Sequence, residues 1–309
     1  MSYREFPDYF ADAETSWPEA DYVVYGIPYD RTGSFRSGTA EGPRYIRRAA
    51  WNNELYHIPT GLHMESFKIH DYGDLDVSNK DTPEEMVEKG YAFAKQVVSE
   101  GKIPILLGGE HNVPMGPVKA VAEAYPDLVV VQVDAHLDYR DEYDGSKYNH
   151  ANALRRFVEA VGADDVAIIG VRSMEREERA AAERDGVLAH CHTSFDVRQL
   201  GIKAILDDIF ARFGDRPVYL TIDIDGVDPA YAPGTGTPEP FGLTDWETLE
   251  IVKRCAPNLV GMDVVEVCPE YDNGQTAMLA SKFVREALFW QLHAQKNGHK
   301  VPVVEAKAR

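Results

Sequence analysis

The sequence predicts an α/β fold, in which a mostly parallel sheet of about eight strands lies between two layers of helices. Three observations lead to this prediction. Apolar runs of strand length alternate with helical segments along the 309 residues, several of these runs are continuous, and no Pro/Gly/Ser-rich linker divides the chain. Continuous apolar runs are typical of strands buried on both faces, and their alternation with helices favours a covered parallel sheet. We therefore expect a single three-layer α-β-α domain over residues 1–309.

Eight apolar runs are the expected strands. They lie at residues 21–27, 67–71, 103–108, 128–133, 165–170, 187–191, 217–223 and 259–266. All of them are far shorter than the roughly 20 apolar residues that a membrane-spanning helix needs. We therefore expect strands of a buried sheet and no segment that enters a membrane.

Helices are expected between most of these strands, and two of them have clear start signals. Thr82 and Glu85 have the spacing of a capping box, with Pro83 at the first helical position. Thr244 and Glu247 repeat the capping-box spacing ahead of another apolar face. Both segments are therefore expected to begin helices at these threonines.

The rest of the chain adds two helices and two long connections. A long final helix is expected over 276–292, and Gly42-Pro43 should begin another. The connections 28–66 and 139–156 are longer than the usual loop between elements of a compact domain. Loops of that kind are commonly functional, so we expect both connections to contribute to a site.

The composition favours a cytoplasmic protein with a small ligand. The formal net charge is −19, which disfavours nucleic acids and anionic membranes as partners and favours cationic substrates, although a solvated acidic surface accounts for most of it. The three cysteines, Cys191, Cys255 and Cys268, have no metal-type spacing and are expected to be reduced thiols. The first residues contain no apolar region typical of a signal peptide.

Carboxylates or histidines directly follow four of the expected strands. Because the carboxyl ends of parallel strands open onto one crevice, we expect these side chains to gather there. Aspartates and imidazoles together are the ligands expected for a pair of manganese-like divalent cations. The candidate ligands are His111, Asp134, His136, Asp138, Asp223 and Asp225.

Three of these motifs resemble the signatures of the ureohydrolases, the family of arginases and agmatinases. The motifs are Gly109-Glu110-His111, Asp134-Ala135-His136-Leu137-Asp138 and Asp223-Ile224-Asp225-Gly226-Val227-Asp228-Pro229. The resemblance extends from Gly38 to Asp272 and is strongest towards agmatinases. It implies an arginase-like fold, a hydrolase that acts on a guanidino compound and releases urea, and a homotrimer or homohexamer.

The resemblance also implies a binuclear centre with two Mn²⁺ ions per chain, with nickel or another divalent ion as the alternative. One ion would be held by His111, Asp134, Asp138 and Asp223. The other would be held by Asp134, His136, Asp223 and Asp225. All six positions carry the expected residue type, and their four carboxylates balance the charge of two divalent ions.

In this family a hydroxide that bridges the two ions attacks the guanidinium carbon, since coordination lowers the pKa of water from about 16 to about 7–9. By the same resemblance, Asp138 would orient the nucleophile and relay a proton to the leaving amine. His150 resembles a proton-shuttling histidine, a role that a near-neutral pKa suits. Glu266 resembles the glutamate that hydrogen-bonds the guanidinium. The alternative for His150 is a solvated loop histidine. The alternative for Glu266 is a residue that only caps the end of a strand.

Agmatine is the expected substrate, hydrolysed to putrescine and urea, which would place the chain in polyamine biosynthesis. The segment Gly170–Ser173 is similar to that of agmatinases, and the segment Ser146–His150 lacks the loop with which arginases hold an α-carboxylate. Arginine would bring its carboxylate into an acidic pocket with no identified cation to receive it. Guanidinobutyrate, guanidinopropionate, guanidine and arginine are the alternative substrates, because enzymes that use them share the metal ligands.

Two other classes of protein are weaker alternatives. A metal-dependent deacetylase of related fold would normally hold one catalytic zinc ion and lack this set of six ligands. A non-catalytic scaffold that retained the fold would be expected to have lost ligands, and this chain has kept all of them. Urea release distinguishes a ureohydrolase from the deacetylase, and any turnover distinguishes it from the scaffold.

Overall fold

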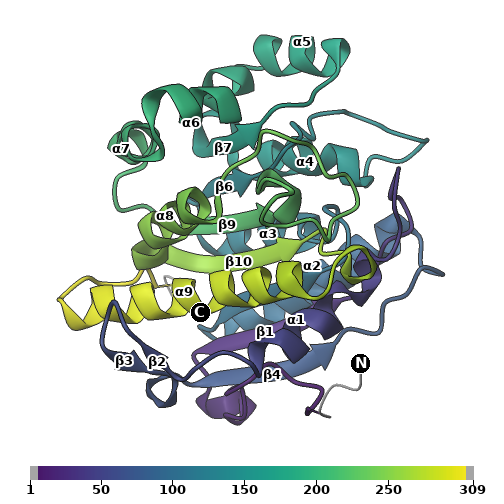
Figure 1. The fold of residues 1–309 in the computed structure, drawn as a ribbon. Helices are drawn as coiled ribbons and strands as arrows, with labels where there is room; N and C mark the ends of the chain where they lie inside the picture. Colours follow the sequence, from purple (N-terminus) through teal and green to yellow (C-terminus); the bar gives the residue numbers. More distant parts are fainter. Residues whose placement is uncertain (1–5, 304–309) are drawn as a thin grey trace, which may run out of the picture.

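Eight strands form one sheet in which every neighbouring pair is parallel (Figure 1). The structure is a computed structural model that describes residues 6–303. The strand order is β4-β1-β5-β10-β9-β6-β7-β8. The strands are β1 (Tyr22–Ile27), β4 (Ile69–Asp74), β5 (Ile103–Gly108), β6 (Val129–Val133), β7 (Val166–Val171), β8 (Cys191–Thr193), β9 (Val218–Asp223) and β10 (Leu259–Val265). A separate antiparallel hairpin consists of β2 (Tyr56–His57) and β3 (Leu62–His63).

The predicted parallel sheet is confirmed, and one predicted strand is misplaced. Residues 187–191 were expected to form a strand, but Val187–His190 form a 3₁₀ helix, and β8 begins at Cys191. Gly186 precedes this helix with φ 84°, a left-handed conformation that turns the chain. The apolar side chain of Val187, which lies in this helical turn, is fully buried. It therefore packs in the core although its backbone is not extended.

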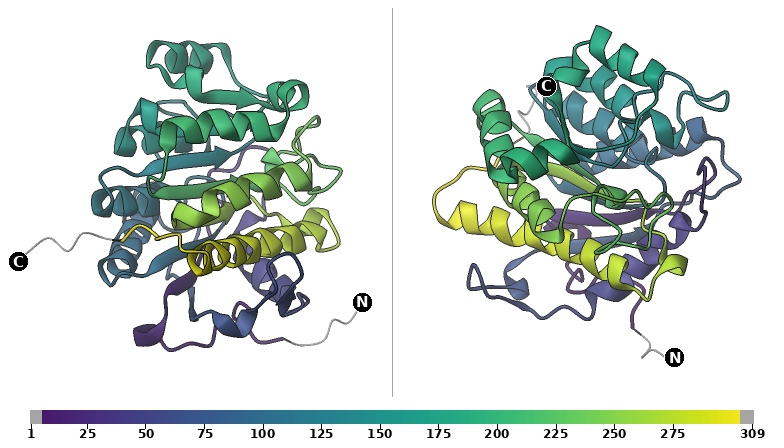
Figure 2. Two further views of the ribbon diagram at one scale, coloured as in Figure 1. Left: turned by 90° about the vertical axis from the view of Figure 1, so that its left-hand side faces the viewer. Right: turned by 45° about the horizontal axis from the view of Figure 1, so that its top comes forward.

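Helices cover both faces of the sheet, which makes the predicted three-layer domain (Figures 1 and 2). Buried apolar side chains of α1, α6, α7, α8 and α9 pack on one face, and those of α2, α3, α4 and α5 pack on the other. The helices are α1 (Gly42–Ala50), α2 (Pro83–Ser99), α3 (Met115–Ala124), α4 (Ala153–Val161), α5 (Arg176–Arg184), α6 (Ser194–Leu200), α7 (Ile202–Phe213), α8 (Asp245–Cys255) and α9 (Gln275–Lys296). No helix within residues 6–303 is long and apolar enough to cross a membrane.

The predicted helix starts are also confirmed. Thr82 and Thr244 each accept the predicted capping-box bond, at the starts of α2 and α8. Gly42-Pro43 begins α1, and the final helix α9 exceeds the expected 276–292 at both ends. The residues 1–5 and 304–309 lie outside the described part, so the extent of the domain over the full 1–309 stays a prediction.

The three strands that precede the candidate ligands and the strand that precedes Glu266 are neighbours at the centre of the sheet, in the order β5-β10-β9-β6. Their ends are nearly level, because Val265 pairs with Asp223 and Val133 pairs with Ile222. The loop after β1 crosses this edge at Gly109, where an added Cβ would lie 1.9 Å from the Tyr29 carbonyl oxygen. The topology therefore brings the ends of these four strands and this loop to one place.

A buried ion pair ties α1 to the edge of the sheet and provides a test of the fold. The Arg47 guanidinium donates to both carboxylate oxygens of Asp71, at 2.8 and 3.1 Å, and also contacts Asp74. The Asp71 side chain is fully buried. Arg47→Met should therefore lower the free energy of unfolding by about 3–5 kcal/mol, because it leaves a buried carboxylate unpaired.

Urea unfolding followed by circular dichroism measures this change. Arg44→Met is the matched control on the same helix, because the Arg44 side chain is largely exposed and its ion pair with Glu41 spans 3.6 Å. The control should change the free energy of unfolding little, since exposed ion pairs contribute little. Equal effects of the two substitutions would contradict the stabilising role of the Arg47–Asp71 pair.

Candidate metal centre and pocket

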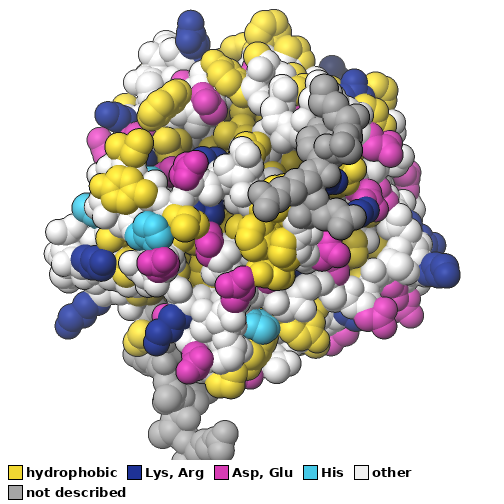
Figure 3. Space-filling view, turned by 60° about the horizontal axis from the view of Figure 1, so that its bottom comes forward, with side chains coloured by type: hydrophobic (Ala, Val, Ile, Leu, Met, Phe, Trp, Pro, Cys, Tyr) yellow, Lys and Arg dark blue, Asp and Glu magenta, His cyan; other side chains and the backbone are white. Residues whose placement is uncertain are grey.

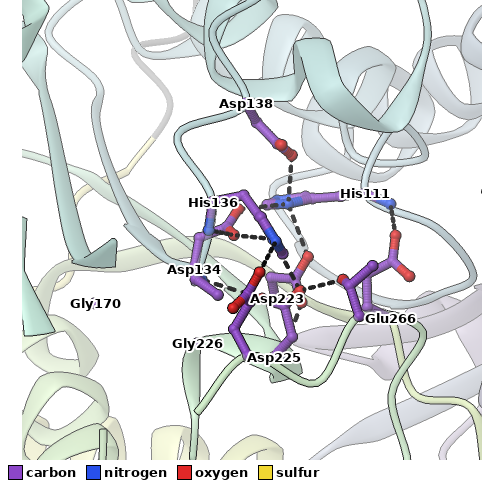
Figure 4. A network of polar contacts seen from close by, with 12 residues as sticks. His111, Asp134, His136, Asp138, Gly170, Asp223, Asp225, Gly226 and Glu266 are labelled. Atoms are coloured by element: carbon purple, nitrogen blue, oxygen red, sulfur yellow. Dashed lines mark hydrogen bonds and ion pairs between the residues drawn. The ribbon is translucent and has the colours of Figure 1, made fainter. Parts of the chain in front are cut away.

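The six predicted ligands lie together at the carboxyl edge of the sheet (Figure 4). His111 follows β5, Asp223 is the last residue of β9, and Asp225 lies in the 3₁₀ turn that follows. The other three, Asp134, His136 and Asp138, follow β6. All except His136 are buried.

The first cluster surrounds His111. Its Nδ1 lies 3.0 Å from Asp134 Oδ2 and 3.2 Å from Asp223 Oδ2. A third carboxylate oxygen, Asp138 Oδ2, lies 3.3 Å from the same nitrogen. One nitrogen and two or three oxygens thus converge closely enough to hold a single ion.

The second cluster surrounds His136. Its Nδ1 lies 3.1 Å from Asp225 Oδ2 and 3.7 Å from Asp134 Oδ1. The two oxygens of Asp134 therefore face different histidines, so this carboxylate is shared by the two clusters. Asp223 belongs by distance to the first cluster alone. This arrangement offers two adjacent cation sites with one bridging carboxylate.

The hydrogen bonds of His111 show which of its nitrogens is available for an ion. Its Nε2 lies 3.0 Å from Thr221 Oγ1, and the Thr221 hydroxyl donates to Asp263 Oδ1 at 2.8 Å. Thr221 therefore accepts from His111, and Nε2 carries the proton. The buried Nδ1 makes no hydrogen bond within the described residues, although it faces three carboxylates. A lone pair among carboxylates is repulsive unless a proton or a cation lies between them, so these residues fit a divalent metal.

The pKa values reflect the crowding of buried acids. Burial, and next the charge of Asp134, raise the pKa of Asp138 to about 7. Burial opposes the charged form of His136, but Asp225, Asp134 and Asp138 outweigh it and raise the pKa of His136 to about 11. The site therefore favours bound positive charge, whether it comes from protons or from metal ions.

Two of the candidate catalytic residues have strained backbones. Asp138 has φ 51° and Glu266 has φ 61°, in the left-handed region that residues other than glycine rarely adopt. Such conformations cost about 1–3 kcal/mol and concentrate at functional sites, where surrounding contacts maintain them. Both residues line the same pocket.

Glu266 is oriented by the His111 segment. The backbone N–H of His111 donates to Glu266 Oε1 at 2.8 Å, and the Glu266 N–H donates to the Gly109 carbonyl at 2.8 Å. Burial, and next the nearby Glu110, raise the pKa of Glu266 above its ordinary value. Glu266 thus has a fixed carboxylate at the pocket wall, which a cationic ligand would stabilise in its charged form.

His150 lies in the pocket wall at the start of a short 3₁₀ helix, His150–Asn152. Its backbone N–H donates to Thr32 Oγ1 at 3.1 Å, and its Nδ1 lies 3.3 Å from the same oxygen. Burial, followed by the charge of His136, lowers the pKa of His150 to about 4. The expectation of a near-neutral pKa is therefore wrong, and His150 is held as a neutral imidazole that can accept a proton.

A pocket of about 190 Å³ opens above the clusters. Its lining includes Gly236 and Thr237, and it also includes two arginines, Arg36 and Arg140. Neither arginine forms an ion pair within residues 6–303; their guanidinium groups lie over tyrosine rings, each 4.6 Å from the ring centroid. The expectation that no cation could receive a substrate carboxylate is therefore wrong.

Two residues that the sequence motifs did not single out support the site. The Arg172 guanidinium donates to five backbone carbonyls, including those of Gly170, Asp225 and Gly226, and so joins the ends of β7 and β9. Gln132 Nε2 donates to Asp134 Oδ2 at 2.7 Å. A buried glutamine in an apolar strand is a visible signal, but its partner depends on the fold.

The sequence and the structure are similar to known proteins across most of their length. The sequence model of the Arginase family matches residues 20–290. An agmatinase of Bacillus anthracis is 38% identical over 285 residues, which are 90% of this chain and 94% of that one. A guanidinobutyrase of Pseudomonas aeruginosa is 33% identical over 277 residues, 87% of this chain and 85% of that one. The solved structure of an agmatine ureohydrolase of Thermoplasma volcanium has a TM-score of 0.87 and 38% identity, and it covers 95% of this chain and 97% of its own.

Proposed function

Because the chain belongs to the Arginase family and is therefore a hydrolase, we propose that it hydrolyses a small guanidino compound to urea at a binuclear manganese centre. The observation that carries the proposal is the buried Nδ1 of His111, which faces the carboxylates of Asp134, Asp138 and Asp223 and makes no hydrogen bond within residues 6–303. A second cluster with His136 and Asp225 shares Asp134 with the first. Imidazole and carboxylate ligands suit manganese.

We assign the six residues to the two ions as the resemblance to the ureohydrolases implies, and Asp223, which by distance lies in the first cluster alone, would reach the second ion only once both ions are bound. His111, Asp134, Asp138 and Asp223 would hold one ion, and Asp134, His136, Asp223 and Asp225 would hold the other. When bound, the two ions would supply a hydroxide at neutral pH and would stabilise negative charge that develops in the reaction.

Three residues of the pocket would handle the substrate and its protons. The Glu266 carboxylate would accept hydrogen bonds from the guanidinium and hold it against the clusters. Asp138, whose Oδ2 faces His111, would take up the proton of the nucleophile on its other carboxylate oxygen and deliver it to the leaving amine. His150 is neutral in the folded protein. It would accept a proton released in the reaction and pass it to solvent at the mouth of the pocket.

Agmatine is the substrate that we propose, and a guanidino acid such as guanidinobutyrate is the second candidate. Two divalent ions would balance the charge of the four aspartates. The other charged residues that line the pocket are three glutamates and two arginines, and their net negative charge favours a dication. The unpaired guanidinium groups of Arg36 and Arg140 favour the second candidate, because an arginine receives a carboxylate well. The net charge of −19 is not decisive here, since Figure 3 shows acidic and basic side chains interspersed on one face.

The two candidate substrates, agmatine and guanidinobutyrate, can be distinguished by their rates of urea release. Arginine and guanidine are measured beside them, under identical manganese loading. We expect agmatine to have the highest kcat/KM, by about tenfold or more, since about 1.4 kcal/mol of unfavourable charge is sufficient for that ratio. Arg140→Met should raise kcat/KM for agmatine and lower it for guanidinobutyrate.

Arg254→Met is the control for this substitution, because Arg254 is half-exposed on α8 and does not line the pocket. If guanidinobutyrate or arginine has the highest kcat/KM, agmatine is the wrong substrate while the ureohydrolase proposal stands. If none of the four compounds releases urea, the proposed function itself is wrong.

The proposal extends to the setting of the enzyme. We infer a cytoplasmic protein that supplies putrescine to polyamine biosynthesis and assembles as a homotrimer or homohexamer. The three cysteines are free thiols, as expected for a reducing compartment. Light scattering coupled to gel filtration measures the assembly; a monomeric mass would reject that part of the proposal.

A further inference from the structure

Three consecutive residues at the end of β5 contact three different parts of the site. The His111 side chain lies in the first cluster. The side chains of its neighbours Glu110 and Asn112 do not contact the clusters; they bond to each other and to the two long loops of the pocket. Both are almost fully buried. These two residues are therefore candidates for fixing the loops relative to the ligands.

Glu110 holds the loop after β1. Its Oε2 accepts the backbone N–H of Thr32 at 2.8 Å, and its Oε1 accepts Asn112 Nδ2, also at 2.8 Å. The Glu110 N–H in turn donates to the Tyr29 carbonyl at 2.9 Å. Glu110 is 1% exposed, so water does not provide alternative partners for these donors.

Asn112 holds the second loop, which carries His150. Its Nδ2 donates to the Tyr148 carbonyl at 2.9 Å, in addition to its bond to Glu110. Tyr148 is two residues before His150, so the amide limits where this histidine can lie. Glu110 and Asn112 thus connect both loops to the segment that carries His111.

Thr32 completes the connection, because its hydroxyl contacts His150 twice. Thr32 Oγ1 accepts the His150 backbone N–H at 3.1 Å and lies 3.3 Å from His150 Nδ1. With that acceptor bond made, the Thr32 hydroxyl hydrogen is available to Nδ1, which leaves the proton of the neutral ring on Nε2. The backbone of Thr32 is held by Glu110, so the imidazole orientation depends on Glu110 through Thr32.

We propose that Glu110 is a positioning residue that holds both loops of the pocket and thereby orients His150. The proposal rests on the proposed function, since it assumes that His150 transfers protons. Both carboxylate oxygens of Glu110 accept from donors. A glutamine there has one acceptor oxygen and one amino group, so Glu110→Gln must lose one bond and set two donors against each other.

Glu110→Gln should lower kcat by about 10- to 100-fold, the scale expected when a reacting group is displaced by about 1 Å. Its metal content should remain that of the wild type, because neither oxygen of Glu110 contacts the clusters. Glu286→Gln is the matched control: Glu286 is also a largely buried glutamate with two side-chain partners, His57 and Trp290, but it lies on α9 outside the pocket. The control should retain the wild-type kcat.

A double variant can exchange the donor and acceptor groups of Glu110 and Asn112 and so restore their hydrogen bond. In the double variant Glu110→Gln/Asn112→Asp, the new amide can donate to the new carboxylate while its oxygen accepts the Thr32 N–H. This double variant should recover part of the kcat lost in Glu110→Gln, although its bond to the Tyr148 carbonyl is absent. Thr32→Val should lower kcat as Glu110→Gln does, and Thr32→Ser, which keeps the hydroxyl, should lower it much less.

A cycle with His150→Asn decides whether Glu110 acts through His150. If it does, Glu110→Gln should lower kcat at least tenfold in the wild type and less than threefold in the His150→Asn background. Equal fold losses in both backgrounds would overturn the proposal, and so would a wild-type kcat or a lost metal ion in Glu110→Gln. If His150→Asn alone leaves kcat unchanged, the assigned role of His150 fails, and with it the positioning of that histidine for catalysis.

Discussion

Replacement of Asp225 by alanine should leave one tightly bound metal ion per chain and lower kcat by about 1,000-fold. Asp225 belongs to the His136 cluster alone, since its Oδ2 lies 3.1 Å from His136 Nδ1. Loss of even an outer-shell partner weakens metal binding by about 10- to 100-fold, so loss of a ligand should weaken one ion by at least that much. A metal ion contributes several kcal/mol to charge stabilisation, and about 4 kcal/mol corresponds to the expected loss in rate.

Elemental analysis of the manganese-loaded protein measures this result directly, with about two ions per chain in the wild type. Asp228→Asn is the matched control, because Asp228 lies three residues away and its carboxylate accepts, among residues 6–303, the backbone N–H groups of Ala230 and Gly242 and no others. The control should keep both ions. A wild-type stoichiometry that never exceeds one ion would reject the binuclear centre, whatever the activity.

The parts of the fold that the sequence predicts are those that depend on local pattern. Continuous apolar runs predict seven of the eight strands within a few residues, and capping boxes predict the starts of α2 and α8. The exception is residues 187–191, where a buried apolar run forms a helical turn after Gly186. An apolar run of this length satisfies the core in either conformation, so its pattern alone does not decide between them.

The candidate ligands could be predicted because they lie in short motifs that come after apolar runs. That four runs become neighbouring strands is a property of the topology, which the sequence indicates only through the expectation of a parallel sheet. The strained backbones of Asp138 and Glu266 have no local signal, because a positive φ is uncommon for any residue other than glycine. Long-range contacts impose them, as when the His111 N–H fixes the Glu266 carboxylate.

The supporting residues were missed for the same reason. Arg172 joins carbonyls of segments more than fifty residues apart, and Glu110 contacts Thr32 across 78 positions of the sequence. The two pocket arginines, Arg36 and Arg140, lie on the two long loops, whose conformations no periodic pattern predicts. Substrate choice therefore depends on the part of the site that is hardest to derive from sequence alone.

The substitution His150→Asn should lower kcat by about 100-fold or more while both metal ions and the fold are retained, the usual scale for the loss of a general acid or base. An asparagine oxygen at this position can still accept a hydrogen bond from Thr32, so the loop should keep its place. The variant lacks a group that titrates near neutral or acidic pH. The measurements are kcat between pH 6 and 10 and metal content; an unchanged kcat across that range would return His150 to a structural role.

The same substitution should also change how stability depends on pH, which tests the burial of His150 independently of activity. The pKa of His150 is lowered to about 4 in the folded protein, against an ordinary value of about 6.5 in the unfolded chain. The unfolded chain therefore binds more protons as the pH falls from 6.5 towards 4, and the wild type loses stability over that window. Relative to its value at pH 8, the free energy of unfolding should fall by about 2 kcal/mol more in the wild type than in His150→Asn at pH 5. If urea unfolding of the two proteins shows the same dependence on pH, the His150 imidazole is solvated in the folded protein. A solvated imidazole would not be held by Thr32 and Glu110 in the orientation that proton transfer requires.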